Sequence, residues 1–198
     1  SPTLLFQYMK HLGIVPDSQT ATALYYGIKT DTVGSGRSSN NHDLEMMSYI
    51  FPEISLTKLT KIESPELPRY YYKNLRKALD YAEIMDDIIF CNLGEVRNAD
   101  LIAETSDFLL RMRDVKWTFV VGKIDNNGYF SLRSKSSVMK VSRITMSLVI
   151  KLGTGGGHMK SAGGQINLEG KNYDEVAEII KLRLLKRAGF KGEDIKKV

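Results

Sequence analysis

The chain has 198 residues, of which 42% are hydrophobic and 26% charged, the composition of a globular protein long enough to bury a core. It has no apolar run near the ~18 residues needed to span a membrane and no signal-peptide pattern, so we expect a cytoplasmic protein without a membrane partner. Cys91 is the only cysteine, which excludes an intramolecular disulfide and a cysteine-built zinc cluster. The net charge of +5 permits binding of nucleic acid without arguing for it.

The first part of the chain is predicted to be helical. Apolar residues with helical spacing predict three helices, over residues 4–12, 21–28 and 43–50. After Pro68 the chain contains no further proline, a shift in composition that predicts a domain boundary. We therefore expect a first domain over residues 1–62, a linker helix region over residues 63–80 and a second domain over residues 81–198.

The second part of the chain is predicted to be mixed α/β. The pattern predicts strands over residues 84–96, 117–124, 129–134 and 165–168, and helices over residues 69–80, 99–112, 141–152 and 173–185. A hairpin turn is expected at residues 125–128, because Asn-Gly tolerates positive φ. Residues 181–197 are expected to be a solvated basic end.

Residues 153–164 form the most distinctive stretch, because six of these twelve residues are glycine. Glycine loses more backbone freedom on folding than any other residue, so we expect a loop rather than a helix or strand. Such a loop brings backbone N–H groups close to an anion, and His158 and Lys160 can both donate to one. The alternative is a mobile surface connection.

The run Gly155-Gly156-Gly157-His158-Met159-Lys160-Ser161-Ala162-Gly163 closely resembles the GGGHxxAAG signature of the domain that follows the catalytic domain in DHH-family phosphoesterases. That family includes RecJ-type exonucleases, nanoRNase-type oligoribonucleases and cyclic-dinucleotide phosphodiesterases. A related domain ends alanyl-tRNA synthetases. The resemblance implies a substrate-binding role for Gly155, Gly156, Gly157, His158, Ala162 and Gly163.

A second stretch, TALYYGIKTDTVG over residues 22–34, resembles the DHH-family motif that carries a metal-binding aspartate. The carry-over lands on Asp31 and implies Mn²⁺ or Mg²⁺, which prefer hard oxygen ligands. By its own pattern, Asp31 between two threonines also fits a helix cap or turn. Arg37 follows in a polar loop that the resemblance places near the active site, where it would face phosphate.

The run Phe130-Ser131-Leu132-Arg133-Ser134 resembles the VSLRS strand of the same family. The resemblance implies that Arg133 and Ser134 bind the phosphate or the terminal nucleotide of the substrate. Arginine suits this role because its planar fork can grip a phosphate through two hydrogen bonds. The alternative is a solvated charge at the end of a strand.

The other metal-binding motifs of the family have no counterpart in the chain, which contains neither an Asp-His-His nor an Asp-x-Asp triplet. Hydrolysis by two metal ions needs several carboxylates to hold them, and Asp31 alone does not supply these. We therefore expect the C-terminal part of a longer enzyme, with metal binding dependent on missing N-terminal ligands. We expect little or no hydrolysis by the chain alone.

Together these patterns predict an α/β fold, with the helical end of a DHH catalytic domain followed by a mixed-sheet substrate-binding domain. The expected function is that of a metal-dependent phosphoesterase acting on short nucleic acids or nucleotides, in which this part binds the substrate end. The alternatives are a non-catalytic nucleic-acid-binding module and a cyclic-dinucleotide or polyphosphate phosphoesterase. The expected partner is a single-stranded oligonucleotide or nucleotide, and the sequence leaves a homodimer, the cleavage polarity and the choice of DNA or RNA open.

Overall fold

The computed structural model describes residues 2–34, 41–135, 141–187 and 196–197. The chain divides into two compact units, Ser1–Glu66 and Leu67–Val198, and each is described by itself. Among the described residues, no helix has both the length and the apolar character that crossing a membrane requires.

The first unit is helical. Its elements are α1 (Pro2–His11), α2 (Ser18–Lys29), η1 (Thr30–Gly34), α3 (Asn41–Ile50), η2 (Phe51–Glu53) and α4 (Leu56–Glu63). α2 begins where the Asp17 carboxylate accepts a hydrogen bond from the backbone N–H of Thr20, and Ser55 caps α4 in the same way. The small core of this unit includes Phe6, Ile28 and Ile50.

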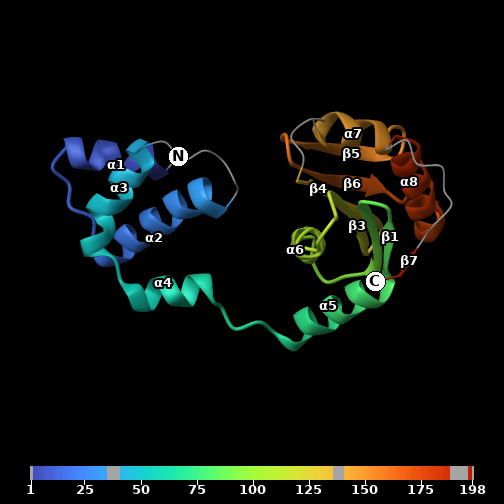
Figure 1. The fold of residues 1–198 in the computed structure, drawn as a ribbon, viewed down its shortest axis with the longest axis horizontal. Coiled ribbons are helices and arrows are strands. Elements are labelled where there is room, and N and C mark those ends of the chain that lie inside the picture. Colours follow the sequence, from blue (N-terminus) through green and yellow to red (C-terminus); the bar gives the residue numbers. More distant parts are fainter. Residues whose placement is uncertain (1, 35–40, 136–140, 188–195, 198) are drawn as a thin grey trace. The chain divides into compact units, whose positions relative to one another are not determined.

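The second unit is a mixed seven-stranded sheet with helices on both faces (Figure 1). Its elements are α5 (Arg69–Tyr81), β1 (Ala82–Met85), β2 (Ile88–Glu95), α6 (Asp100–Leu109), β3 (Trp117–Ile124), β4 (Asn127–Ser134), α7 (Val141–Leu148), β5 (Gly153–Gly157), β6 (Ser161–Asn167), α8 (Tyr173–Arg187) and β7 (Lys196–Lys197). The strand order is β5-β6-β4-β3-β2-β1-β7. β2 and β3 are parallel and are joined through α6, whereas the other neighbouring strands are antiparallel, so the predicted α/β fold with a mixed sheet is confirmed.

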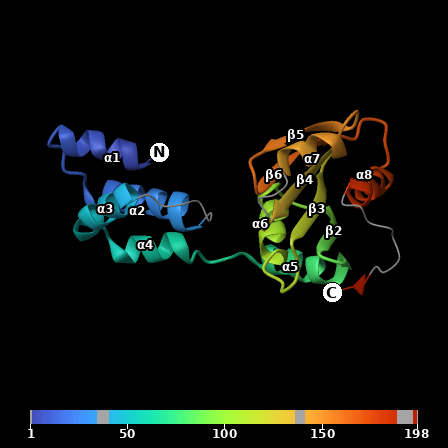
Figure 2. The same ribbon diagram turned by 45° about the horizontal axis from the view of Figure 1, so that its top comes forward.

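Two hydrophobic cores lie on opposite faces of the sheet. Phe119 and Leu132 face the core under α7 and α8, while Cys91 and Val120 belong to the core under α5 and α6. Figure 2 shows the same elements from a second direction, with α7 and α8 away from α5. Since β3 is covered on both faces, its sequence is almost continuously apolar instead of alternating.

Three phenylalanine rings run across the strands on the α7/α8 face. Phe119 stacks on Phe90 with centroids 5.9 Å apart and on Phe130 with centroids 5.5 Å apart. Such pairs contribute about 0.5–1.5 kcal/mol beyond the burial of their area. Phe130 is therefore a fixed ring beneath the neighbouring strand β6, which restricts what can stand opposite it.

The strand expected over residues 84–96 is two strands, so that expectation was wrong in its connectivity. β1 and β2 form an antiparallel hairpin that turns at Asp86, whose φ is +56°. Aspartate tolerates this left-handed conformation better than most residues, because its short side chain bonds locally to the backbone.

The hairpin expected at residues 125–128 joins β3 and β4, and its two loop residues are Asp125 and Asn126. Positive φ occurs at Asp125 (+50°), whereas Gly128 already lies within β4, opposite Ile166 of β6. A Cβ at Gly128 would lie 3.1 Å from the Cβ of Ile166. The glycine therefore serves the close packing of two strands, and the turn depends on Asp125.

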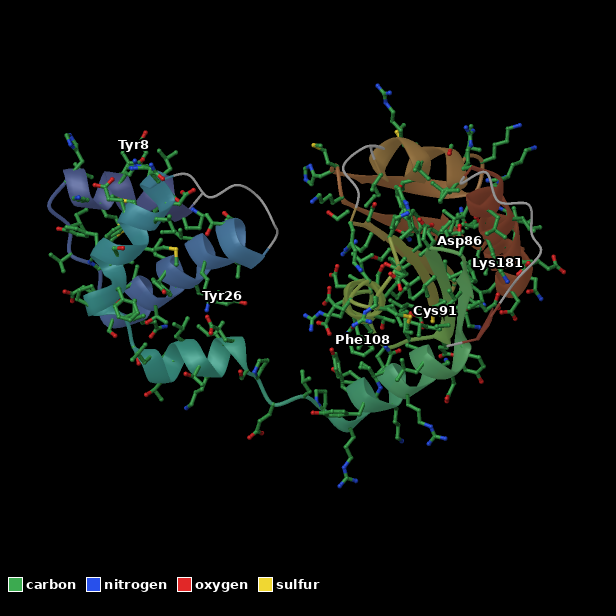
Figure 3. The ribbon with its side chains drawn as sticks, in the orientation of Figure 1. Tyr8, Tyr26, Asp86, Cys91, Phe108 and Lys181 are labelled. Carbon is green, nitrogen blue, oxygen red and sulfur yellow. The ribbon has the colours of Figure 1, made fainter. Side chains whose placement is uncertain are left out.

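Lys181 departs from the expectation that residues 181–197 are solvated. Its side chain is only 9% exposed, and its Nζ lies 2.5 Å from a carboxylate oxygen of Glu83 in β1. The ammonium also lies 5.3 Å from the ring centre of Phe90. Figure 3 labels Lys181 on α8, beside the sheet that carries Cys91. A paired lysine is thus part of the packing of α8 on the edge of the sheet.

Candidate anion-binding site

The glycine-rich stretch forms a β-hairpin, not the expected loop. β5 and β6 pair from Gly153↔Ile166 to Gly157↔Ala162, and residues 158–160 make the connection between them. None of the glycines in this hairpin has positive φ. The glycines are explained by close approach instead, and the two sides of the hairpin differ in what approaches them.

One side of the hairpin packs against the protein itself. A Cβ at Gly155 would lie 2.8 Å from Thr145 Cγ2 in α7 and 2.9 Å from Phe130 Cζ. Its partner across the strands, Gly164, is equally constrained, because a Cβ there would lie 2.1 Å from the carbonyl oxygen of Thr154. These glycines let the hairpin lie flat on the core, which is a structural requirement.

The other side of the hairpin is open. Gly156 pairs with Gly163, and an added Cβ at Gly156 would meet no described atom within 4 Å. α6 packs on β3 and β4, and Figure 1 shows it end-on beside these strands and below β5 and β6. The two facing glycines therefore form a floor of bare backbone beyond the edge of α6.

A cavity of about 720 Å³ lies over this floor. It is lined by Ala99, Ala103, Tyr129, Phe130, Ser131, Arg133, Thr154, Gly155, Gly156, Gly157, His158, Ser161, Ala162, Gly163, Gly164 and Gln165. The structure thus brings together seven of the residues that the sequence singled out: Arg133, Gly155, Gly156, Gly157, His158, Ala162 and Gly163. They come from two separate stretches, which meet because β4 pairs with β6.

Arg133 brings a permanently charged guanidinium to the cavity, and contacts with described residues hold this group in place. Its side chain is 18% exposed, and its Nε donates a hydrogen bond of 2.8 Å to the carboxylate of Asp107 in α6. Nη1 lies 3.3 Å from the carbonyl oxygen of Ala162 and donates to it. A guanidinium fixed in this way loses little further freedom when it binds an anion.

His158 and Ser134 lie in different surroundings. The side chain of His158 is exposed on the connection between β5 and β6, and its backbone N–H donates 2.7 Å to the carbonyl of Ser161. Ser134 is 2% exposed at the end of β4, and its backbone N–H donates to the carbonyl of Lys160. Ser134 is not among the described residues that line the cavity, whereas His158 is.

Ser131 is a residue of the cavity that the sequence reasoning missed. It is 3% exposed, and its Oγ has no hydrogen-bond partner among the described residues. A buried hydroxyl without a partner costs about 1–3 kcal/mol, so such a group is commonly satisfied by a ligand or a water. The alternation of side chains in a strand could have found it, because Ser131 and Arg133 face the same side of β4.

The first unit holds the predicted metal ligand. Asp31 lies in η1, directly after α2, with an exposed side chain. Among the described residues, no three His, Cys, Asp or Glu side chains cluster as a metal site would require. Asp31 would therefore need further ligands to hold a metal ion. Arg37 lies outside the described residues.

Comparison with known proteins identifies the fold. No family model matches the sequence. An uncharacterised protein of Methanocaldococcus jannaschii is 31% identical over 201 residues, which cover 97% of this chain and 41% of that protein. The chain thus spans about two fifths of this relative's length.

Solved structures extend the comparison. An exopolyphosphatase-related protein from Bacteroides fragilis superposes with a TM-score of 0.72 at 17% identity, covering 95% of this chain and 56% of that one. RecJ in complex with Mn²⁺ from Thermus thermophilus gives a TM-score of 0.49 at 16% identity, over 96% of this chain and 27% of that one. The match to the Bacteroides fragilis protein shows that the two chains share a fold.

Proposed function

We propose that the second unit binds the phosphate-bearing end of a single-stranded oligonucleotide, as the substrate-holding part of a metal-dependent phosphoesterase. The observation that carries this proposal is the pairing of an oriented guanidinium, Arg133, with a floor of bare backbone at Gly156 and Gly163 in one cavity. A positive charge supplies attraction to phosphate, and the missing side chains allow close approach.

Each residue has a defined part in this binding. The bonds of Arg133 to described residues use Nε and Nη1, so Nη2 is the nitrogen we assign to a phosphate oxygen. His158 donates a further hydrogen bond from the exposed end of the cavity. Asp107 acts through Arg133, because it positions the guanidinium without lining the cavity.

Hydrolysis would require more than these groups. In the proposed enzyme Asp31 is one metal ligand, and Mn²⁺ or Mg²⁺ would supply an activated water and neutralise charge on the phosphate. The second unit would orient the substrate end and fix its phosphate, which is a binding role. Among the described residues, Asp31 does not belong to a cluster of possible metal ligands. Binding of the substrate end, which needs no metal ion, can therefore be measured directly with this chain.

Polyphosphate is the second candidate substrate, because the similar structure from Bacteroides fragilis is described as exopolyphosphatase-related. The charges in the cavity favour a single terminal phosphate instead. Arg133 and His158 are the only basic side chains among the described residues that line it. A chain of phosphates needs a cation for most of its charges, so inorganic tripolyphosphate is expected to bind more weakly than a 5′-phosphorylated oligonucleotide.

The test is a calorimetric titration of the chain with a 5′-phosphorylated tetranucleotide. Arg133→Ala is expected to weaken binding roughly tenfold to a hundredfold, since a hydrogen bond to a charged group contributes about 1.5–3 kcal/mol. Arg76→Ala is the matched control, because Arg76 also pairs with an aspartate, Asp80, but on exposed α5. Equal affinity of the wild type and Arg133→Ala would overturn the proposal.

A further inference from the structure

A second cavity continues the first along the same strands. It has a volume of about 870 Å³ and lies where β4 and β5 begin and β6 ends. Thr154 and Gln165 line both cavities, so the two form one continuous groove. The glycine floor and Arg133 occupy only one part of this groove.

The register of the strands defines the path of the groove. From one end to the other, the pairs on the open face are Arg133↔Ser161, Ser131↔Gly163, Tyr129↔Gln165 and Asn127↔Asn167. These residues share a face because side chains alternate along a strand. The first and last pairs lie six positions apart along β4, which is about 20 Å at 3.4 Å per residue. The groove is therefore much longer than one phosphate group requires.

The chemistry changes along this path. Arg133 gives the first end a positive charge, whereas Asn126, Asn127 and Asn167 give the second end mainly neutral amides. The Oδ1 of Asn167 accepts a hydrogen bond from the backbone N–H of Glu169, so its NH₂ group is the part available to a ligand. Lys171 and Glu169 also line this end and oppose each other in charge.

The middle of the groove carries an aromatic ring. Tyr129 is half-buried, packs against the core under α6 and lines the first cavity. Its partner across the strands is the exposed amide of Gln165. An aromatic face beside an amide suits a nucleobase, because the ring stacks on the base and the amide hydrogen-bonds to its edge.

We propose that the groove binds at least two successive nucleotides of a single strand, with a base site at Tyr129 and Gln165 and a further site at Asn127 and Asn167. This inference rests on the proposed function, since it starts from a terminal phosphate at Arg133. Neutral amides and opposed charges suit bases and sugars better than a second terminal phosphate. The groove thus selects oligonucleotides over mononucleotides.

The experiment compares a 5′-phosphorylated mononucleotide with the corresponding tetranucleotide. For the wild type, we expect the tetranucleotide to bind at least tenfold more tightly. Asn167→Asp keeps the acceptor for Glu169 but places a negative charge on the path, so it is expected to abolish this gain while the mononucleotide affinity stays within twofold. Gln165→Ala is a second variant, at an exposed side chain, and should also reduce the gain.

Asn172→Asp is the matched control, because Asn172 also accepts backbone hydrogen bonds through Oδ1, from Asp174 and Glu175, and does not line the groove. Equal binding of mononucleotide and tetranucleotide by the wild type would overturn the inference and leave the proposed function standing. A gain that survives in both Asn167→Asp and Gln165→Ala would also overturn it. Failure of both ligands to bind would instead refute the proposed function itself.

Discussion

Two neighbouring glycines of the hairpin are predicted to respond in opposite ways to the same substitution. Gly155 faces α7 and the ring of Phe130, whereas Gly156 faces the open cavity. Gly155→Ala would place its Cβ 2.8 Å from Thr145 Cγ2 and 2.9 Å from Phe130 Cζ, both in a packed environment. We expect overpacking that lowers the free energy of unfolding by about 1–3 kcal/mol.

Gly156→Ala is expected to leave the fold intact. The new Cβ would meet no described atom within 4 Å, and the position does not have positive φ. Replacing glycine at such a position reduces the freedom of the unfolded chain, which stabilises by about 0.4–1 kcal/mol. The same methyl group would project over the floor where we place the phosphate, so we expect weaker binding of a 5′-phosphorylated oligonucleotide.

Urea denaturation followed by tryptophan fluorescence measures the first effect. Trp117 is the only tryptophan and lies in β3, so the signal reports the second unit alone. With an m value of about 2 kcal/mol/M, Gly155→Ala should lower the midpoint by about 0.5–1.5 M. Calorimetry with the oligonucleotide measures the second effect. Equal destabilisation by the two substitutions would refute the assignment of Gly155 to the packed side of the hairpin and of Gly156 to the open side. Undiminished affinity of Gly156→Ala for the oligonucleotide would refute it as well.

Three further predictions concern Cys91, Lys181 and the metal dependence of hydrolysis. Burial raises the pKa of the Cys91 thiol from 9.0 to about 12, so the thiol of the unfolded chain ionises at a lower pH than the thiol of the folded chain. The stability that the protonated thiol contributes is therefore fully present below pH 9 and is lost as the pH rises towards 12. This loss should reach about 1.4 kcal/mol at pH 10 and be absent in Cys91→Ala, as urea titrations at two pH values would show. Lys181→Ala should lower the free energy of unfolding by about 1.5–3 kcal/mol, because it removes the charged partner of Glu83. Lys181→Met should destabilise less, because methionine keeps the apolar part of the side chain. Equal urea midpoints for the two variants would contradict this. Addition of Mn²⁺ to the chain alone should give no hydrolysis of the oligonucleotide, and turnover by a preparation that Asp31→Ala inactivates would contradict this.

The sequence predicted the elements whose apolar patterns were long and regular. α2, β3 and α8 lie where the pattern places them, because one period of side chains decides which face is buried. Short turns were less predictable. The hairpin at Asp86 was missed although Asp86 and Asp87 interrupt the apolar residues of the two flanking strands.

The glycine hairpin shows why composition alone misled. Glycine is disfavoured in isolated strands, and we expected a loop on that ground. In the folded unit the strands β5 and β6 lie so close to each other and to Phe130 that side chains are excluded, and this tertiary constraint outweighs propensity. The second cavity could not be predicted from the sequence, because its lining comes from turns and strand ends that are brought together by strand pairing.

Most residues of the candidate site could be predicted from two motifs, at residues 130–134 and 155–163. The arrangement of these residues in space could not be predicted. The pairing of β4 with β6 sets Arg133 opposite Ser161 and Ser131 opposite Gly163, and the pattern of neither stretch predicts the position of the other. Ser131 and Asp107 depend on the same pairing and on where α6 ends. Such residues become visible only when the faces of the strands and helix are known.

The most direct test of the account compares two tetranucleotides that differ only in a 5′-phosphate or a 5′-hydroxyl group. We predict that the wild type binds the phosphorylated form at least tenfold more tightly, and that this preference disappears in Arg133→Ala and is reduced in His158→Ala. Equal affinity of the wild type for the two forms would show that the cavity does not recognise a terminal phosphate and would contradict the central claim.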